Sequence, residues 1–299
     1  DTALRQALQR AAGRMPVVLG ASDRRGDGPA IEPGLAAATD WGLACAGRRF
    51  SLAYAMPLAA GPDPGATPPA LTPSLALAAF ARPAADGPTV VEGVDLARRT
   101  LRARARADGR SVDIAYFGAE RAGRTQSGCP LVARGDWVAE QLVDPASLRL
   151  PFTRTAYPAL LAGDPLALTA LNDRIVLVGT MLPAVDVLTL PGGQPRWGME
   201  LIAAQLDGLL LARTVRAPGP GLQAALGIAL GLAGAALAIA LHGRPGRWLL
   251  LALVSAALGW VLAVIGWYLA EGQLLGAHYG WVALALGAYA ARRIMRSAL

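Results

Sequence analysis

The side chains that most often carry catalysis are scarce in this sequence. Its two histidines, His242 and His278, both lie in or beside strongly apolar segments, so residues 1–241 offer no histidine as a general base or zinc ligand. Every basic residue is an arginine, which removes the lysine of a phosphate-binding Walker loop and of Schiff-base chemistry. These absences exclude most familiar enzyme classes.

Two carboxylates remain as chemical candidates. Asp186 and Glu200 could act as an acid and a base if the fold held them at a suitable separation. Asp186 also belongs to a loop with Thr180, Thr189 and Pro191, and these residues form our candidate ligand-binding site. An aspartate in such a loop also commonly caps a turn, so a structural role stays open. No metal-ligand spacing or cofactor motif is present, and we expect neither a metal nor a cofactor.

The two cysteines bear on the compartment of the protein. Cys45 and Cys129 could pair in an oxidising compartment or remain separate buried thiols. Their spacing does not decide between these states.

The composition places part of the chain in a membrane. Hydrophobic residues make up 54% and charged residues 16% of the 299 residues, and the mean hydropathy is +0.39. The apolar excess lies in three runs, at residues 222–241, 248–270 and 274–291. The first two are long enough to cross a hydrocarbon core of roughly 30 Å, and the third is shorter and holds one histidine. We therefore expect an N-terminal domain at residues 1–217 and three transmembrane helices with a short basic tail at 218–299.

Small residues in these runs indicate how the helices pack. Gly227 and Gly231, and likewise Gly276 and Gly280, are about one helical turn apart and would let two backbones approach closely. The short links between runs require antiparallel neighbours, which predicts a three-helix bundle. The lipid bilayer is thus the first expected partner.

Arginines beside the runs predict the orientation of the membrane part. Those that follow the first or third run are Arg244, Arg247, Arg292, Arg293 and Arg296. The positive-inside rule places these residues and the C-terminus in the cytoplasm and the N-terminal domain outside, although Arg213 and Arg216 argue weakly the other way. The net charge of +7 is otherwise scattered, without a basic stripe and interleaved aromatics, so we expect no nucleic-acid partner.

The N-terminal domain shows a mixed pattern of strands and helices. In chain order we expect a helix at Leu4–Ala12, strands at Pro16–Gly20 and Phe50–Ala55, helices at Ser74–Ala81 and Leu96–Ala107, and a strand at Ser111–Phe117. The clearest strand is Arg174–Thr180, a continuous β-branched run of the kind buried in parallel sheets, and a helix should follow at Gly198–Leu211. The intervening loop leaves the end of that strand at which open α/β sheets bind ligands. The pattern predicts an α/β domain with a parallel or mixed sheet and flanking helices.

These last segments resemble a known family. The strand ending in Val178-Gly179-Thr180, the loop with Asp186, and the helix opening at Gly198 ahead of three apolar runs are similar to the second type of CHASE domain. That name denotes a cyclase- and histidine-kinase-associated sensory extracellular domain of bacteria. Ile202-Ala203 stands where the family has a His-Ala pair. The family also begins with an anchor helix and early strands and continues into an effector, so we expect a partial product, or a sheet completed by another chain, that resembles a sensor without its output.

The resemblance implies a bacterial sensory protein of the cytoplasmic membrane, with an extracytoplasmic domain that detects an envelope signal. Any cyclase or kinase activity would then belong to a separate effector or partner, and the chain itself would not be an enzyme. Expected partners are a protein or a second copy of the chain, and a small ligand. Two alternatives stay open: a structural or interaction subunit of a membrane-anchored assembly, and an envelope enzyme that uses paired carboxylates.

Overall fold

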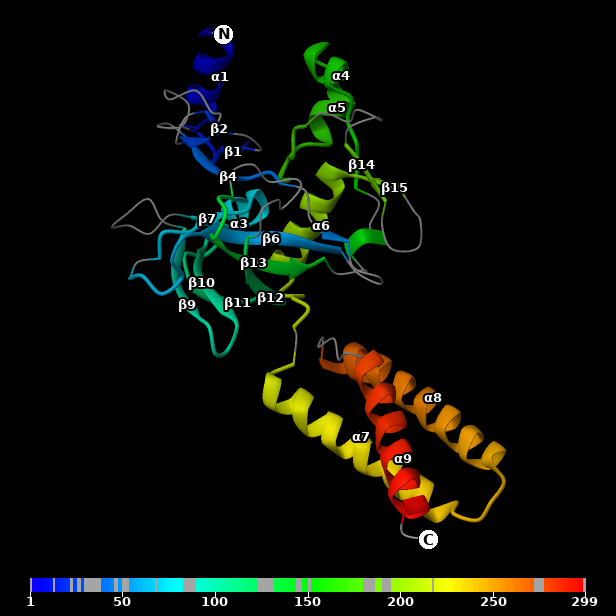
Figure 1. Cartoon of the computed structure of the whole chain (residues 1–299). Helices are drawn as coiled ribbons and strands as arrows, with labels where there is room; N and C mark the ends of the chain where they lie inside the picture. Colours follow the sequence, from blue (N-terminus) through cyan, green and yellow to red (C-terminus); the bar gives the residue numbers. More distant parts are fainter. Residues whose placement is uncertain are drawn as a thin grey trace. The chain divides into compact units, whose positions relative to one another are not determined.

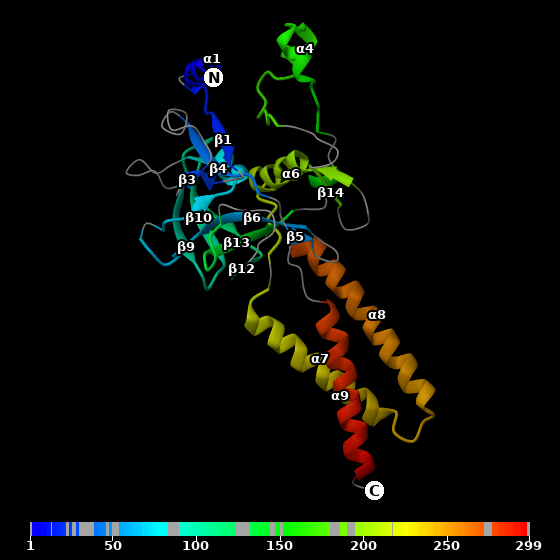
Figure 2. The ribbon, with the colours of Figure 1, turned by 45° about the horizontal axis from the view of Figure 1, so that its top comes forward.

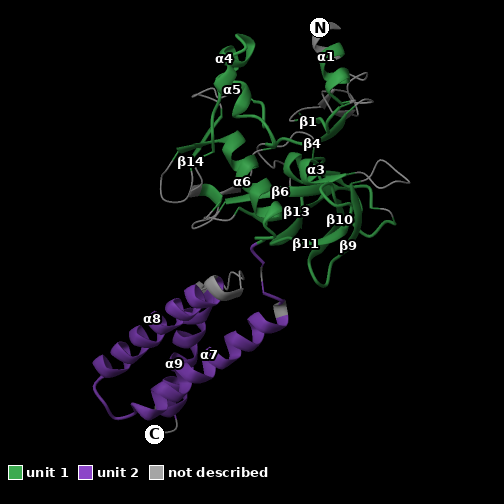
Figure 3. Ribbon diagram, turned by 180° about the vertical axis from the view of Figure 1, so that it is seen from behind, with its two compact units in different colours: residues 1–214 green, residues 215–299 purple. Residues whose placement is uncertain are grey.

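The computed structural model divides into two compact units, unit 1 (residues 1–214) and unit 2 (residues 215–299), coloured separately in Figure 3. The expected boundary between residues 217 and 218 lies close to this division. The described residues are 2–12, 14–21, 24–25, 28–29, 39–45, 48–49, 54–67, 69–82, 90–122, 132–143, 147–149, 152–179, 186–189, 195–216, 218–271 and 277–297.

Unit 1 contains both strands and helices (Figure 1). Its helices are α1 (Thr2–Ala12), α3 (Leu75–Phe80), the 3₁₀ turn η1 (Ser147–Arg149), α4 (Tyr157–Leu161), α5 (Pro165–Thr169) and α6 (Gly198–Leu210). Its strands are β1 (Val18–Ala21), β2 (Arg24–Arg25), β3 (Gly28–Pro29), β4 (Asp40–Leu43), β5 (Arg48–Arg49), β6 (Tyr54–Gly61), β7 (Thr72–Pro73), β8 (Ala81–Arg82), β9 (Val91–Asp95), β10 (Thr100–Ala105), β11 (Ser111–Ala115), β12 (Gly118–Arg121), β13 (Trp137–Leu142), β14 (Val187–Thr189) and β15 (Pro195–Trp197). The expected combination of mixed sheets and helices is confirmed.

An antiparallel sheet with the order β12-β13-β6-β5 forms the centre of unit 1, and β7 also pairs with β6. Every residue of β6 and of β13 is buried. Strands that are buried on both faces need cover on both sides, and α6 supplies part of it. Leu201 and Ala204 of α6 are fully buried in the same apolar cluster as Leu58 of β6.

A second antiparallel sheet has the order β11-β10-β8, with β9 also paired to β10. The helix expected at Leu96–Ala107 is therefore wrong, because β10 occupies the middle half of this range. Leu101 and Ala103 are fully buried, whereas Arg102 between them is exposed. This period-two alternation, which suits a strand with one buried face, outweighs the helix propensity of Ala, Leu and Arg.

The parallel part of unit 1 is small: β1 and β4 pair in parallel, and α3 packs against them. Ser74 caps α3, since its Oγ accepts a hydrogen bond of 3.1 Å from the backbone N–H of Leu77. Gly42 of β4 lies so close to this cap that a Cβ built on it would be 2.6 Å from the carbonyl oxygen of Ser74. Glycine is thus needed where β4 meets the start of α3.

The strand expected at Arg174–Thr180 is wrong, since the described residues of this range form no strand. Among described residues, 175–179 pair with no strand, and Ile175 and Val178 are 57% and 80% exposed. Leu177 alone of this run packs against the main apolar cluster. The physical reason is that a β-branched run favours extended backbone but does not encode its pairing partner, and β1 and β4 pair with each other.

Unit 2 comprises α7 (Pro220–Ala240), α8 (Gly246–Glu271) and α9 (Ala277–Ser297). Two of these helices contain stretches long and apolar enough to cross a membrane, at Gly221–Ala240 and Gly246–Tyr268. The third helix, α9, packs along α7. Figure 2 shows the three helices from a second direction.

Glycines mark the closest helix contacts in unit 2. A Cβ on Gly287 of α9 would collide with the carbonyl oxygen of Gly231, and one on Gly234 with that of Leu284, so α7 and α9 touch backbone to backbone. Of the glycines predicted to pack helices, Gly231 therefore lies in this contact, and Gly280 faces the indole of Trp260 on α8. Gly227 has no such neighbour within 4 Å. Gly276 is outside the described residues.

Candidate functional site

The candidate site lies where the β14–β15 hairpin leads into α6. Antiparallel pairing sets Val187 opposite Trp197, and the backbone N–H of Gly198 donates a hydrogen bond of 2.9 Å to the carbonyl oxygen of Asp186. Asp186 is thereby fixed beside the first residue of α6. Thr189 is exposed at the opposite end of the hairpin. The other candidates, Thr180 and Pro191, lie outside the described residues.

Glu200 is the buried charge of this region. It stands in the first turn of α6, where one oxygen, Oε2, accepts a hydrogen bond of 3.2 Å from the backbone N–H of Trp197. Its Oε1 accepts a hydrogen bond from Nη2 of Arg154, and Nη1 of Arg196 lies 3.8 Å from Oε2. The side chain of Glu200 is only 7% exposed, against 54% for Arg154.

The contacts of Glu200 are with Trp197, Arg154 and Arg196. Both oxygens of Glu200 already accept hydrogen bonds, and a neighbouring arginine adds a further positive charge, so the carboxylate positions groups around it. The guanidinium groups of Arg154 and Arg196 both lie beside the carboxylate of Glu200. The exposed half of Arg154 can offer its remaining N–H groups to an anionic ligand, such as a carboxylate or a phosphate.

Part of this arrangement of charged side chains can be predicted from the sequence. A glutamate three residues after the helix N-cap is the second half of a capping box, a signal available at Trp197 and Glu200. Arg154 had no such signal because 46 residues separate it from Glu200. Arg196 was equally inconspicuous among the many arginines of the chain.

From the site, α6 runs back into the core and is held there by polar contacts as well as by packing. The side-chain amide of Gln205 is buried and donates a hydrogen bond of 3.0 Å to the carbonyl oxygen of Pro57 on β6. Ser147 of η1 donates through its hydroxyl to Asp207 at 2.7 Å. A buried, satisfied hydrogen bond is costly to break, so the bond from Gln205 helps to hold α6 against the central sheet.

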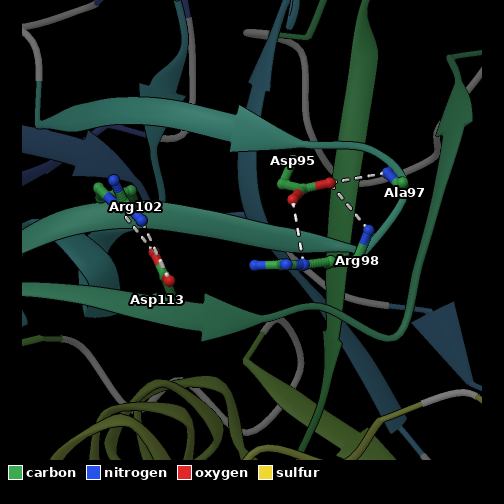
Figure 4. A network of polar contacts seen from close by, with 5 residues as sticks. All are labelled: Asp95, Ala97, Arg98, Arg102 and Asp113. Carbon is green, nitrogen blue, oxygen red and sulfur yellow. Dashed lines mark hydrogen bonds and ion pairs between the residues drawn. The ribbon is translucent and has the colours of Figure 1, made fainter.

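A second polar cluster, on β9–β11, is shown in Figure 4. Asp95 Oδ1 accepts hydrogen bonds from the backbone N–H groups of Ala97 and Arg98, at 3.0 and 2.9 Å, and so closes the turn between β9 and β10. Arg102 and Asp113 pair across β10 and β11 with two hydrogen bonds, which lowers the pKa of Asp113 and raises that of Arg102. All of these groups are satisfied by one another at the surface, so we assign the cluster a structural role.

Two further observations bear on the chemistry. Among the described residues, no group of three or more His, Cys, Asp or Glu side chains is arranged to hold a metal ion. Cys45 is buried and disulfide-bonded. Cys129, the other cysteine of the chain, lies outside the described residues.

Comparison with protein-family models, with curated proteins and with solved structures found no match to this chain.

Proposed function

We propose that the chain is a bacterial membrane-anchored sensory protein whose unit 1 lies outside the cytoplasm and whose unit 2 is a bundle of three membrane helices. The observation that carries the proposal is α6. It begins at the Glu200–Arg154 site, is fixed to the central sheet by Gln205, and ends shortly before the first apolar helix, α7. A ligand at one end of α6 therefore acts on the element that precedes the membrane.

The compartment is inferred from the disulfide and from the charges. Disulfides persist in oxidising compartments and are rare in the cytoplasm, so the bonded Cys45 supports an extracytoplasmic unit 1. The arginines after α7 and at the end of α9 support a cytoplasmic location for the opposite end of unit 2. Three spans connect these two locations, whereas two would return the chain to its starting side.

The proposed mechanism is a shift between two arrangements of the helices. An anionic ligand that binds the remaining N–H groups of Arg154 draws the guanidinium group away from Glu200 and so alters the first turn of α6. The segment that connects α6 to α7, residues 211–219, is short and contains the conformationally restricted Pro218. A displacement of α6 therefore passes along this segment into the start of α7. The ligand shifts the equilibrium only as far as its affinities for the two arrangements differ.

The test has two parts. A reporter enzyme active only in the cytoplasm, fused after Leu299, should be active, while protease added to spheroplasts should digest unit 1. For the site, thermal unfolding of the full chain in detergent should be measured with inorganic phosphate and a panel of small carboxylates. At least one anion should raise the melting temperature of the wild type but not of Arg154→Gln, while Arg98→Gln, a matched change at an exposed arginine, should respond as the wild type does.

A second candidate function, a structural or interaction subunit, is favoured by a different observation. The hairpin of α4 and α5 and the following run expose large apolar side chains: Tyr157, Leu161, Leu166, Leu168, Ile175, Val176 and Val178. Exposed apolar surface of this extent is typical of protein contacts. Purification from native membranes separates the two functions, because a subunit keeps one stoichiometric partner under every growth condition and shows no anion response.

A further inference from the structure

Unit 2 joins the ends of its three helices through a small apolar cluster. The cluster contains residues from the last turns of α7, the first turn of α8 and the second half of α9. Its members are Ala238, Leu249, Ala288 and Ala291, and Leu241 packs against them. Side chains that lie far apart in the sequence are thereby held at one end of the bundle.

Four arginines flank this cluster, and we call them the basic end of unit 2. Arg244 and Arg247 lie in or beside the link between α7 and α8, and Arg292 and Arg293 directly follow the buried Ala291. The guanidinium group of Arg292 reaches α8, since a Cβ built on Gly246 would lie 3.8 Å from its Nη1. Charges from two separate segments therefore converge on the start of α8.

Among the described residues of unit 2, no acidic side chain pairs with these four arginines. Glu271 is the one acidic side chain in the sequence of residues 215–299, and it ends α8, a helix of 26 residues that spans about 39 Å. None of the ion pairs formed by described residues includes the four arginines. The C-terminal dipoles of α7 and α9 supply roughly half a negative charge each, while the N-terminus of α8 adds about half a positive one. Most of the positive charge is left uncompensated.

Trp248 indicates the depth of the basic end in the membrane. It is 48% exposed and directly follows Arg247 in the sequence. Tryptophan at the end of a membrane helix, as Trp248 is in α8, settles at the level of the lipid headgroups, where phosphates are concentrated. A guanidinium group offers paired N–H donors that match two phosphate oxygens. The basic end therefore has the hydrogen-bond donors, the positive charge and the depth in the membrane that a phosphate headgroup requires.

We propose that the basic end is a binding site for anionic phospholipid headgroups, formed by Arg244 and Arg247 together with Arg292 and Arg293. The inference rests on the proposed function in one respect, that unit 2 lies in a membrane. It adds a ligand class and a lipid preference to that function. Each arginine near an anionic surface contributes about a fivefold gain in affinity, so four together discriminate strongly against zwitterionic lipid.

The experiment measures which lipids the full chain retains. Protein is reconstituted with equal amounts of phosphatidylglycerol and phosphatidylcholine, extracted into mild detergent, and the bound lipids are counted by native mass spectrometry. The wild type should retain phosphatidylglycerol at least about tenfold over phosphatidylcholine, with the preference falling as salt is added. The variant with Arg244→Gln, Arg247→Gln, Arg292→Gln and Arg293→Gln should retain the two lipids equally.

Three controls make the result specific. Lysine at the same four positions keeps the charge and should keep the preference, which separates lipid binding from misfolding. Arg98→Gln with Arg110→Gln removes two exposed arginines of unit 1 and should change nothing. Inorganic phosphate at tens of millimolar should leave phosphatidylglycerol bound, and its displacement by phosphate would identify a site for free anions instead.

The two proposals fail in different ways. A chain that alkaline carbonate strips from membranes contradicts the proposed function. A chain that stays in the membrane but retains both lipids equally contradicts only the binding of anionic headgroups. Persistence of the preference in the glutamine variant would place the lipid elsewhere and overturn the assignment of these arginines.

Discussion

At the scale of single residues, Arg102 and Asp113 form a close, doubly hydrogen-bonded ion pair on the surface of unit 1. Nε of Arg102 lies 2.8 Å from Oδ1 of Asp113, across neighbouring strands, and both side chains are about half exposed. The hydrogen bond with the guanidinium group is the main cause of the lowered pKa of Asp113. Because solvent screens an exposed pair, its contribution to stability is small.

We predict that Asp113→Asn lowers the free energy of unfolding slightly at neutral pH and has no effect in acid. The pKa of Asp113 is lower in the folded than in the unfolded state. Its stabilising contribution is therefore complete above the unfolded pKa, near 3.8, and is lost as the pH falls through the folded pKa. Denaturant unfolding of the full chain across this range measures the difference. Asp108→Asn, at a looser pair of 3.8 Å, serves as the control. A deficit of Asp113→Asn that persists in acid contradicts the linkage.

Glu200 shows what could be predicted about the candidate site. Its position in the first turn of α6 follows from the local sequence, and so does its bond to the backbone of Trp197. Its pairing with Arg154 depends on how β14, β15 and the preceding segment fold back on one another, which no local pattern encodes. The same limit applies to Asp186, whose place beside Gly198 is set by a hairpin.

At the scale of elements, Gly42 decides how closely β4 approaches α3. A Cβ at this position would lie 2.6 Å from the carbonyl oxygen of Ser74 and 2.8 Å from the Cα of Leu75. These are backbone atoms, and α3 is fixed by its serine cap and its buried leucines, so the contact cannot be relieved by a side-chain rotation.

We predict that Gly42→Ala destabilises unit 1 by about 1–3 kcal/mol through overpacking. Gly93→Ala is the matched control, because Gly93 also lies in a strand and a Cβ there meets nothing within 4 Å. Alanine at Gly93 should be neutral or slightly stabilising, since it restricts the unfolded chain. Equal unfolding midpoints for the two variants would show that β4 and α3 separate without cost.

The elements that could be predicted are those whose signal is local. α3 and α6 have clear ends and apolar faces, and both lie within one residue of their expected bounds. β10 was misjudged because alanine, leucine and arginine favour helices, although the alternation of Leu101, Arg102 and Ala103 indicated a strand. The strand predicted at 175–178 is not formed for another reason: a strand requires a pairing neighbour that lies far away in the sequence, and the residues of the run do not specify that neighbour.

At the scale of the whole molecule, the number of membrane spans depends on α9. Composition alone singles out α7 and α8, because α9 ends in a polar turn with several arginines. Its packing supports a third span: Gly231 and Gly234 of α7 meet Gly287 and Leu284 of α9 with backbone contact. Two helices this close share one environment, which supports our proposal that α9 crosses the membrane beside α7.

We predict that Gly287→Val separates α9 from α7 and lowers the melting temperature of the full chain in detergent by several degrees. The added side chain collides with the carbonyl of Gly231, which is backbone and cannot rotate away. Gly259→Val places the same residue in α8, where a Cβ meets nothing within 4 Å, and should leave the melting temperature nearly unchanged. Both variants should remain in the membrane fraction, because α7 and α8 keep their apolar length. If both melt alike, α9 is not held by α7, and the third span loses the packing that supports it.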